Sequence, residues 1–325
     1  MMTATVDEFT AELVVRRREA AADGVVALEL VDPDGGELPK WEPGAHIDLL
    51  LDEGLVRQYS LCGDPREAGT WRVGVLLEPN SRGGSEHVHS HLKEGAAIRV
   101  RGPRNHFPLV ESPKYLFIAG GIGITPMKAM AESAQRAGLD WSMFYLGRTR
   151  STMAFQQELQ DTYGDRVTVW ADDERGGFFD VAAALAEPAD DTVIYSCGPE
   201  PLLAAVEKHC AHWPEGSLHV ERFAAKAPSA ETLAEALDSY QVVCRQAGVT
   251  VEVSDGVPML DALEDAGVAI MSSCGEGICG TCRTTVLEGI PDHRDSLLTE
   301  AERAAANVIL PCVSHSLSGK LVLDL

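Results

Sequence analysis

Residues 272–282 of this 325-residue chain read Ser-Ser-Cys-Gly-Glu-Gly-Ile-Cys-Gly-Thr-Cys. Cys274, Cys279 and Cys282 follow a C-x4-C-x2-C spacing, and Cys312 comes after a further 29 residues. The small residues of this loop let backbone N–H groups approach sulfur atoms, and its glycines allow the unusual dihedral angles of a loop wrapped around one centre. The other four of the eight cysteines are scattered singly, so this clustering needs a chemical explanation.

The spacing is the plant-type arrangement in which four thiolates hold a 2Fe–2S cluster. A four-cysteine zinc site is the alternative, but zinc usually takes two C-x2-C pairs, and this cluster contains one. We therefore predict Cys274, Cys279, Cys282 and Cys312 as ligands of a 2Fe–2S cluster. Such a centre accepts one electron at a time and makes no bonds to a substrate, so another part of the chain must supply electrons.

The charge of the chain excludes several classes of partner. There are 27 Lys and Arg against 50 Asp and Glu, giving a net charge of −23 and an isoelectric point near 4.7. Phosphate backbones and anionic membrane surfaces repel such a chain, so we expect no nucleic-acid or membrane partner. We see no apolar stretch of membrane-spanning length and no signal-peptide core at the N-terminus. These features predict a cytoplasmic protein.

Residues 1 to about 104 contain short strand candidates separated by turn clusters. The candidates are Val25–Val31, His46–Leu51, Val56–Leu61, Trp71–Leu77 and Ala97–Arg101. Strands at this spacing predict a small antiparallel barrel or sandwich.

Two motifs in this region suggest a flat, phosphorylated cofactor. Arg57 and Tyr59 lie two apart in one candidate strand and so project to the same side. The arginine can pair with a phosphate while the ring packs on the cofactor. The turn Gly83-Gly84-Ser85 offers backbone donors and a hydroxyl to an anion. An ordinary half-buried strand and a glycine turn remain the alternative.

From about residue 108 strands alternate with helices. The strand candidates are Tyr115–Ala119, Trp141–Leu146, Val167–Trp170 and Thr192–Cys197, and Pro126–Gly138 has a helical pattern. This alternation predicts a parallel sheet with crossover helices.

Two glycine turns follow strands of this sheet. Gly120-Gly121-Ile122-Gly123-Ile124-Thr125-Pro126 lies between a strand and a helix, where a phosphate loop is expected, with Thr125 as N-cap and Pro126 as first helical residue. A tight turn without a ligand is the alternative, because Pro126 stands where the G-x-G-x-x-G fingerprint has its third glycine. Cys197-Gly198-Pro199 forms a second turn at a strand's carboxyl end, where doubly wound sheets bind ligands.

The chain is expected to have three domains. Residues 224–239, rich in Ala, Ser and Glu, predict a linker. Beyond it, Tyr240–Arg245 and Val249–Val253 predict a β-hairpin, and residues 255–267 a helix. The boundaries that we predict are 1–107 and 108–226 for the first two domains, 227–239 for the linker and 240–325 for the cysteine-rich domain.

Five motifs in order, R-x-Y-S-L, G-G-S, G-G-I-G-I-T-P, C-G-P and the cysteine spacing, resemble the phthalate dioxygenase reductase family, which includes the vanillate demethylase reductases. The resemblance covers essentially the whole chain, including residues 102–108 and 292–295. It implies a multidomain fold with an antiparallel β-barrel flavin domain, an α/β parallel-sheet nucleotide domain and an α+β (β-grasp) plant-type ferredoxin domain.

The resemblance also implies roles for individual residues. Four of them, Ser60, Thr125, Cys197 and Phe223, are expected beside the reacting rings. The implied flavin contacts are Arg57, Tyr59, Ser60, Leu61, Val75, Leu76, Gly83, Gly84 and Ser85. The implied contacts at the nucleotide and its junction with the flavin are Gly120, Gly121, Gly123, Thr125, Pro126, Arg148, Asp172, Cys197, Gly198, Pro199 and Phe223. FMN is favoured over FAD because a short G-G-S turn caps the phosphate and we find no segment for an adenosine half.

The nucleotide is expected to be NADH, which family members generally prefer. Arg148, at the end of the second strand of the sheet, could pair with the 2′-phosphate of NADPH. Asp172 and Asp173, at the end of the third strand, would repel that phosphate.

The resemblance implies the reductase component of a bacterial-type oxygenase system, which moves a hydride from NADH to FMN and single electrons through the 2Fe–2S cluster. Its partner would be a Rieske non-haem iron dioxygenase or O-demethylase, or a haem monooxygenase. Residues 240–325 hold 12 acidic and 5 basic residues, which could steer the chain to a basic patch on that partner or only keep it solvated. A stand-alone NADH:acceptor oxidoreductase and a non-enzymatic iron–sulfur carrier are the alternatives.

Overall fold

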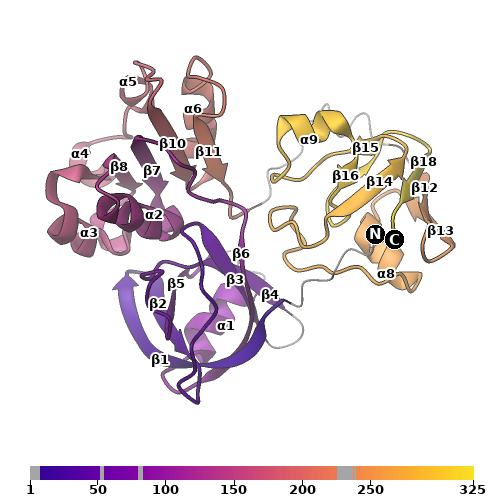
Figure 1. Cartoon of the computed structure of the whole chain (residues 1–325), viewed down its shortest axis with the longest axis horizontal. Coiled ribbons are helices and arrows are strands. Elements are labelled where there is room, and N and C mark those ends of the chain that lie inside the picture. The colour runs from indigo at the N-terminus through magenta and orange to yellow at the C-terminus, as the bar shows by residue number, and fades with distance from the viewer. Residues whose placement is uncertain (1–7, 52–54, 80–82, 225–236, 238) are drawn as a thin grey trace. The chain divides into compact units, whose positions relative to one another are not determined.

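The computed structural model describes residues 8–51, 55–79, 83–224, 237 and 239–325. The chain divides into two compact units, Met1–Glu221 and Arg222–Leu325 (Figure 1). The first unit contains two sheets and the second contains one larger and one smaller sheet. Most of the predicted linker lies outside the described residues.

Six antiparallel strands form the first sheet, in the order β4-β3-β6-β1-β2-β5. Its elements are β1 (Thr10–Ala22), β2 (Val25–Val31), β3 (Ala45–Leu50), β4 (Val56–Ser60), β5 (Trp71–Leu76), α1 (Gly84–His91) and β6 (Ala97–Asn105). A bridge between Leu61, directly after β4, and Val73 of β5 joins the two edges of the sheet. The sheet therefore closes around a core that includes Leu13, Ile47 and Trp71, which confirms the predicted small barrel.

Strand β1, the longest strand of the barrel, was not predicted from the sequence. Three consecutive arginines, Arg16 to Arg18, interrupt its apolar alternation, and only Leu13 and Val15 are fully buried. The strand is stabilised instead by pairing with β2 on one side and β6 on the other. Arg16 also pairs with Glu29 of β2 at 3.0 Å.

Five parallel strands form the second sheet, in the order β11-β10-β7-β8-β9. The strands are β7 (Lys114–Gly120), β8 (Asp140–Gly147), β9 (Val167–Ala171), β10 (Thr192–Cys197) and β11 (Leu218–Glu221). The α-helices are α2 (Ile124–Arg136), α3 (Gln156–Tyr163), α4 (Asp172–Arg175), α5 (Val181–Ala184) and α6 (Glu200–His209). The 3₁₀ helices are η2 (Gly121–Gly123), η3 (Arg150–Thr152) and η4 (Gly164–Arg166). The predicted parallel sheet is confirmed, with β11 as an additional short strand.

This sheet is covered on both faces, as parallel sheets require. Neighbouring residues of β7 show the alternation, because Phe117 packs in the cluster that includes α2 and α3 while Ile118 packs in the cluster that includes α5 and α6. The strand order reverses between β7 and β10, so the two glycine turns that follow these strands lie at the switch point of the sheet.

The start of α2 differs from the prediction. The helix begins at Ile124, two residues before the expected start, and its N-cap is Gly123 because η2 runs directly into α2. Thr125 is therefore not the N-cap. Its Oγ1 donates to the Ile122 carbonyl at 3.0 Å instead of accepting from the helix.

The second unit is built on a mixed sheet with the order β13-β12-β18-β14-β16 and a two-stranded sheet, β15-β17. Its elements are β12 (Ser239–Cys244), β13 (Val249–Ser254), α8 (Met259–Asp265), β14 (Thr284–Glu288), β15 (Pro291–Asp292), α9 (Glu300–Ala305), β16 (Val308–Ile309), β17 (His315–Ser316) and β18 (Lys320–Leu323). The predicted hairpin and helix are confirmed as β12–β13 and α8. Met259 and Leu263 of α8 pack in a core with Val242 and Leu321. Ser239, which the sequence analysis gave to the linker, is the first residue of β12.

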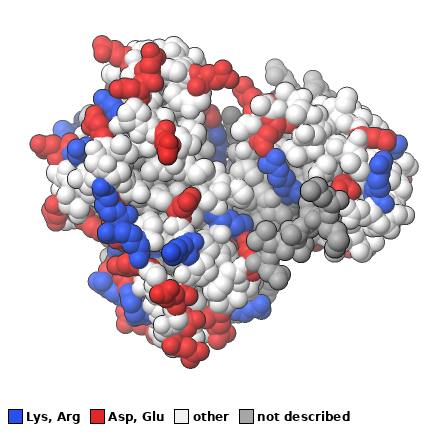
Figure 2. Space-filling model, in the orientation of Figure 1, with Lys and Arg blue, Asp and Glu red and all other residues white. Residues whose placement is uncertain are grey.

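Charged side chains of both signs are scattered over the face shown in Figure 2. On the face shown in Figure 2, acidic residues are spread widely instead of gathering in one patch. Across the described ranges, every helix is too short or too polar to cross a bilayer.

Candidate functional site

The four predicted ligand cysteines come together in the second unit. Cys282 Sγ lies 3.3 Å from Cys312 Sγ. Hydrogen bonds from the sulfurs of Cys279 and Cys312 hold the pKa of Cys274 well below its usual range, and a hydrogen bond from Cys312 lowers that of Cys282. Backbone donors also reach the sulfurs, since the N–H of Glu276 lies 3.2 Å from Cys274 Sγ. These contacts favour the thiolate, the form that binds metal, at Cys274 and Cys282, while the same sulfur contacts raise the pKa of Cys279 and Cys312.

The glycines of this loop have the conformations that the sequence analysis expected. Gly275, Gly277 and Gly280 have φ angles of 66°, 67° and 69°. A Cβ on Gly277 would lie 2.5 Å from Val313 Cγ2 and 2.9 Å from Asp295 Cα, so only glycine fits there. In the described part of the chain, no three His, Cys, Asp or Glu residues converge as ligands of a single metal ion. The C-x4-C-x2-C spacing with one distant cysteine suits a two-iron cluster better than one zinc ion.

A cluster of groups that can bind an anion forms where β4 meets the start of α1. A Cβ on Gly84 would lie 2.5 Å from Arg57 Cγ, which shows that the arginine side chain lies directly on the glycine backbone. Gly83, with φ 86°, is the N-cap of α1. Ser85 is buried, and its Oγ accepts a hydrogen bond from the backbone N–H of Glu78 at 3.1 Å. A guanidinium, a helix N-terminus and a hydroxyl are thus combined, which suits an anion.

The other expected flavin contacts differ in exposure. Tyr59 and Leu76 are partly exposed, and Ser60 is 4% exposed. Leu61 and Val75 are fully buried, and both side chains belong to the core of the closed barrel. Their expected contact with the flavin stays a prediction.

The two glycine turns of the parallel sheet pack tightly on one another. A Cβ on Gly123 would lie 2.2 Å from the Cys197 carbonyl oxygen, and one on Gly198 would lie 2.9 Å from Gly120 Cα. On Gly120, a Cβ would lie 2.7 Å from Pro199 Cδ. These three glycines are thus required for loop packing, whether or not a ligand binds.

Gly121 is different from its neighbours. It has φ 55°, and a Cβ built on it meets no atom within 4 Å. Gly121 is therefore the position at which a ligand can approach the backbone of this loop.

The nucleotide loop also contacts the barrel within the first unit. A Cβ on Gly74 of β5 would lie 2.9 Å from Thr125 Cγ2, so the start of α2 rests on β5. Pro126 follows Thr125 in the first turn and is buried. Because Val75 and Leu76 follow Gly74 directly, this contact brings the loop that is expected to bind the nucleotide beside two residues that are expected to contact the flavin.

Cys197 is buried next to an acid that the sequence analysis did not single out. Glu221 is its register partner on β11, and burial raises the pKa of Glu221 to about 8. The pKa of Cys197 is raised by its own burial and then by the charge of Glu221. Glu221 Oε2 is buried without a hydrogen-bond partner among the described residues. The one feature of the sequence that could have indicated Glu221 is its position directly before Arg222 and Phe223.

Phe223 itself lies just beyond the end of the first unit, and its side chain is 38% exposed. Its expected position against the flavin ring stays a prediction.

Arg148 and Asp172 come together at the ends of β8 and β9. The backbone N–H of Asp173 donates to the Arg148 carbonyl at 3.1 Å. Burial and then the charge of Asp173 raise the pKa of Asp172, while Arg148 opposes them. One basic and two acidic residues therefore surround the carboxyl ends where a nucleotide's ribose is expected.

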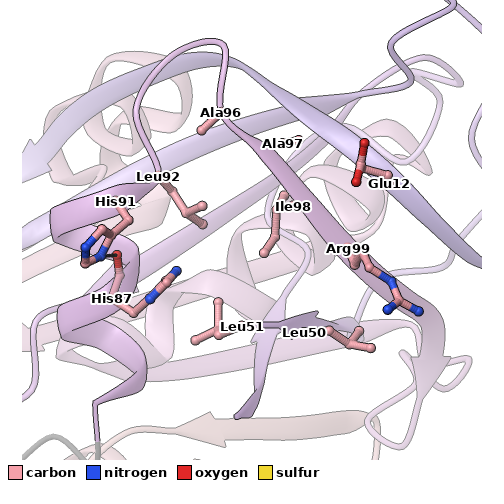
Figure 3. A pocket seen from close by; sticks show the side chains of 10 residues that line it. All are labelled: Glu12, Leu50, Leu51, His87, His91, Leu92, Ala96, Ala97, Ile98 and Arg99. Carbon is pink, nitrogen blue, oxygen red and sulfur yellow. Dashed lines mark hydrogen bonds between the residues drawn. The ribbon is translucent and has the colours of Figure 1, made fainter. Parts of the chain in front are cut away.

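The barrel also has a cavity of about 330 Å³ away from these motifs (Figure 3). Its lining consists of Glu12, Leu50, Leu51, His87, His91, Leu92, Ala96, Ala97, Ile98 and Arg99. In Figure 3 the histidines come from α1 and Arg99 from β6. It includes none of the expected cofactor contacts.

Two domain families match parts of the chain. The family described as 2Fe-2S iron-sulfur cluster binding domain matches residues 242–316. The family described as oxidoreductase NAD-binding domain matches residues 117–208. The first range contains all four cysteines, and the second contains both glycine turns.

Full-length relatives extend the match over the whole chain. Phenoxybenzoate dioxygenase subunit beta of Ectopseudomonas oleovorans is 42% identical over 94% of each chain. Vanillate O-demethylase oxidoreductase of Pseudomonas putida is 40% identical over 96% of this chain and 99% of its own.

Solved structures agree with this match. One of them is phthalate dioxygenase reductase, described as a modular structure for electron transfer from pyridine nucleotides to a 2Fe-2S centre. Its TM-score is 0.73 at 34% identity, and the match covers 97% of this chain and 98% of that chain. An intact type IV self-sufficient cytochrome P450 monooxygenase has a TM-score of 0.88 at 44% identity over 97% of this chain, which spans 41% of that larger protein. The chain therefore belongs to the phthalate dioxygenase reductase family, a family of NAD(P)H-dependent flavin and iron–sulfur oxidoreductases.

Proposed function

We propose that the chain is an NADH-dependent, FMN-containing reductase that passes electrons through its 2Fe–2S cluster to a separate oxygenase. The observation that carries the proposal is the contact between Thr125 of the nucleotide loop and Gly74 of the barrel. It supports side-by-side sites for a nicotinamide and a flavin, which hydride transfer requires. When bound, the flavin converts a hydride into single electrons and the cluster carries them one at a time.

The residues of the chain bind and orient these groups. Arg57, Gly84 and Ser85 would hold one phosphate, and the single guanidinium beside the start of α1 supports FMN as the cofactor. Ser60 would lie at the flavin edge and Cys197 at the nicotinamide, where their burial excludes water. Cys274, Cys279, Cys282 and Cys312 would ligate the cluster.

The charges at the ends of β8 and β9 support NADH. Asp172 and Asp173 would repel the 2′-phosphate of NADPH, and Arg148 would lie along the adenosine instead of pairing with that phosphate. We also propose the domain boundaries 1–107, 108–226 and 240–325, with each cofactor in its own domain.

The acceptor that we propose is a Rieske non-haem iron dioxygenase or O-demethylase, or a haem monooxygenase. Three relatives support this choice by their names, which are those of a dioxygenase subunit, an O-demethylase oxidoreductase and a P450 monooxygenase. We place the reaction in the cytoplasm, where thiols remain reduced.

An anaerobic visible titration of the purified protein with NADH, and separately with NADPH, tests the proposal. The protein should release FMN on denaturation, contain iron and take up three electrons, two in the flavin and one in the cluster. NADH should bleach both sets of bands, and NADPH should do so slowly. Protein without flavin would point to an electron carrier, and zinc in place of iron would overturn the cluster.

A further inference from the structure

Lys128 is a cation that is largely buried between the barrel and the parallel sheet. Its side chain is 10% exposed, and it lies in α2, one turn after Thr125. A lysine seldom occupies such a place unless its charge is paired, because removing an ammonium group from water is unfavourable.

The partners of Lys128 come from both halves of the first unit. Its Nζ donates to the backbone carbonyl of Cys62, a barrel residue, at 3.2 Å. On the other side, Nζ lies 2.9 Å from Glu158 Oε1 of α3 and 5.9 Å from the centre of the Phe155 ring. One side chain thus joins the helix of the nucleotide loop to the barrel backbone.

Arg72 of β5 makes the reciprocal contacts from the barrel. Its guanidinium lies 3.5 Å from the same Glu158 carboxylate and 4.9 Å from the centre of the Phe155 ring. Phe155 has φ 61°, an unfavourable conformation for a residue with a side chain, so its surroundings must hold it. We call Cys62, Arg72, Lys128, Phe155 and Glu158 the junction cluster.

Two residues of the junction cluster lie close in sequence to the motifs that are expected to bind the flavin and the nucleotide. Cys62 comes two residues after Ser60 of the flavin motif, and Lys128 comes three residues after Thr125 of the nucleotide loop. The Lys128–Cys62 hydrogen bond therefore connects the two motifs through a short stretch of chain on one side and one turn of helix on the other.

We propose that Lys128 is a positioning residue that sets the distance between the nicotinamide and the flavin. The inference rests on the proposed function, because it concerns the geometry of the same two sites. Reacting atoms must approach to about 3–3.5 Å, and a displacement of about 1 Å can lower a rate about 100-fold. Lys128 itself touches neither ring.

The test compares variants with matched positions in one helix. K128M keeps the aliphatic stem but removes the charge and the donor to Cys62. The control is R136Q, because Arg136 also extends from α2 to the barrel, where it pairs with Asp64 at 2.8 Å, but lies farther along the helix from Thr125. Anaerobic stopped-flow reduction of the flavin at increasing NADH gives a limiting rate and an apparent Kd for each full-length protein.

For K128M we expect the limiting rate to fall about 10-fold or more, with flavin content, iron content and the Kd for NADH close to wild type. The long-wavelength charge-transfer band of the NADH–flavin complex should weaken as well. R136Q should behave as wild type. A role in stability alone would lower the melting temperature and leave the limiting rate and this band unchanged.

A limiting rate in folded K128M equal to that of wild type overturns the inference, as does a loss explained by missing flavin. If K128M does not fold, K128L decides by the same comparison, because leucine has neither the charge nor the donor of Lys128 toward Cys62 and Glu158. A wild-type protein without flavin, or one that NADH does not reduce, would instead be a failure of the proposed function.

Discussion

Glu221 and Cys197 are Cα partners on the neighbouring strands β11 and β10, at the carboxyl edge of the parallel sheet. Burial raises the pKa of Glu221 to about 8, so this carboxyl is largely protonated at neutral pH. A neutral acid beside a buried thiol avoids an unpaired charge inside the protein. When the pH rises and Glu221 ionises, its buried charge lowers the free energy of unfolding, so the stability of the protein depends on pH.

The first prediction concerns E221Q, which keeps the shape of the side chain and cannot ionise. The folded pKa of about 8 lies above the ordinary value of 4.5, so the folded state holds the proton more tightly than the unfolded state. The stabilising contribution is fully present below about pH 4.5 and is lost as the pH rises through about 8. The wild-type free energy of unfolding should fall relative to E221Q by up to about 1.4 kcal/mol per pH unit in this window.

Urea unfolding at several pH values between about 5 and 8 measures this difference. An exposed acid in the same unit, changed in E187Q, serves as the control and should leave the wild-type pH dependence unchanged. Parallel curves for wild type and E221Q would show that the carboxyl is already ionised in this range.

The second prediction concerns the cluster. C312S removes one of two sulfurs that lie 3.3 Å apart, and a serine hydroxyl is a poor substitute for a thiolate toward iron. We expect most of the iron and the iron–sulfur absorption to be lost, while NADH still reduces the flavin, because the flavin motifs belong to the other unit. Iron analysis and single-turnover flavin reduction measure the two effects.

Cys210 provides the control for C312S. It is a buried cysteine of the parallel-sheet core, outside the cysteine loop, so C210S should keep its iron. A C312S protein with the wild-type iron content would remove Cys312 from the ligand set.

The third prediction concerns the cluster of groups that is expected to hold the flavin phosphate. In G84A the new Cβ would lie 2.5 Å from Arg57 Cγ, so the arginine must leave the turn on which it rests. We expect the Kd of the flavin-free protein for FMN to rise about 10-fold or more, since a charge-assisted contact to the phosphate is disturbed. Fluorescence titration measures this Kd.

The matched control is G69A, an exposed barrel position where a Cβ would meet no atom within 4 Å. Its Kd for FMN should equal the wild-type value. Equal values for G84A and wild type would place the phosphate elsewhere.

The parts of the molecule that the sequence predicts well depend on local spacing. The cysteine loop and the alternation of strands with helices are both encoded within short segments, and the structure agrees with them. Strand β1 was not predicted because its three arginines interrupt the apolar alternation, while pairing with a strand on each side stabilises it. The roles of Lys128 and Glu221 depend on partners 66 and 24 residues away, Cys62 and Cys197, which no local pattern indicates.

The separate roles of the glycines in the nucleotide loop also depend on distant neighbours, and they lead to the last prediction. The sequence indicates a glycine-rich turn but not which glycine serves packing and which admits a ligand. In G123A a Cβ would lie 2.2 Å from the Cys197 carbonyl oxygen, a backbone clash that should destabilise the protein by about 1–3 kcal/mol. In G121A the Cβ enters open space, so the fold should lose only about 1–2 kcal/mol for its positive φ.

Urea unfolding and the Kd for NADH separate these two roles. G121A should fold and bind NADH more weakly than wild type, because its methyl group occupies the space that a nucleotide would use to reach the backbone. G123A should show the larger loss of stability. If G121A binds NADH as tightly as wild type, the open space above Gly121 is not part of the nucleotide site, and the loop is a packed turn that only joins β7 to α2.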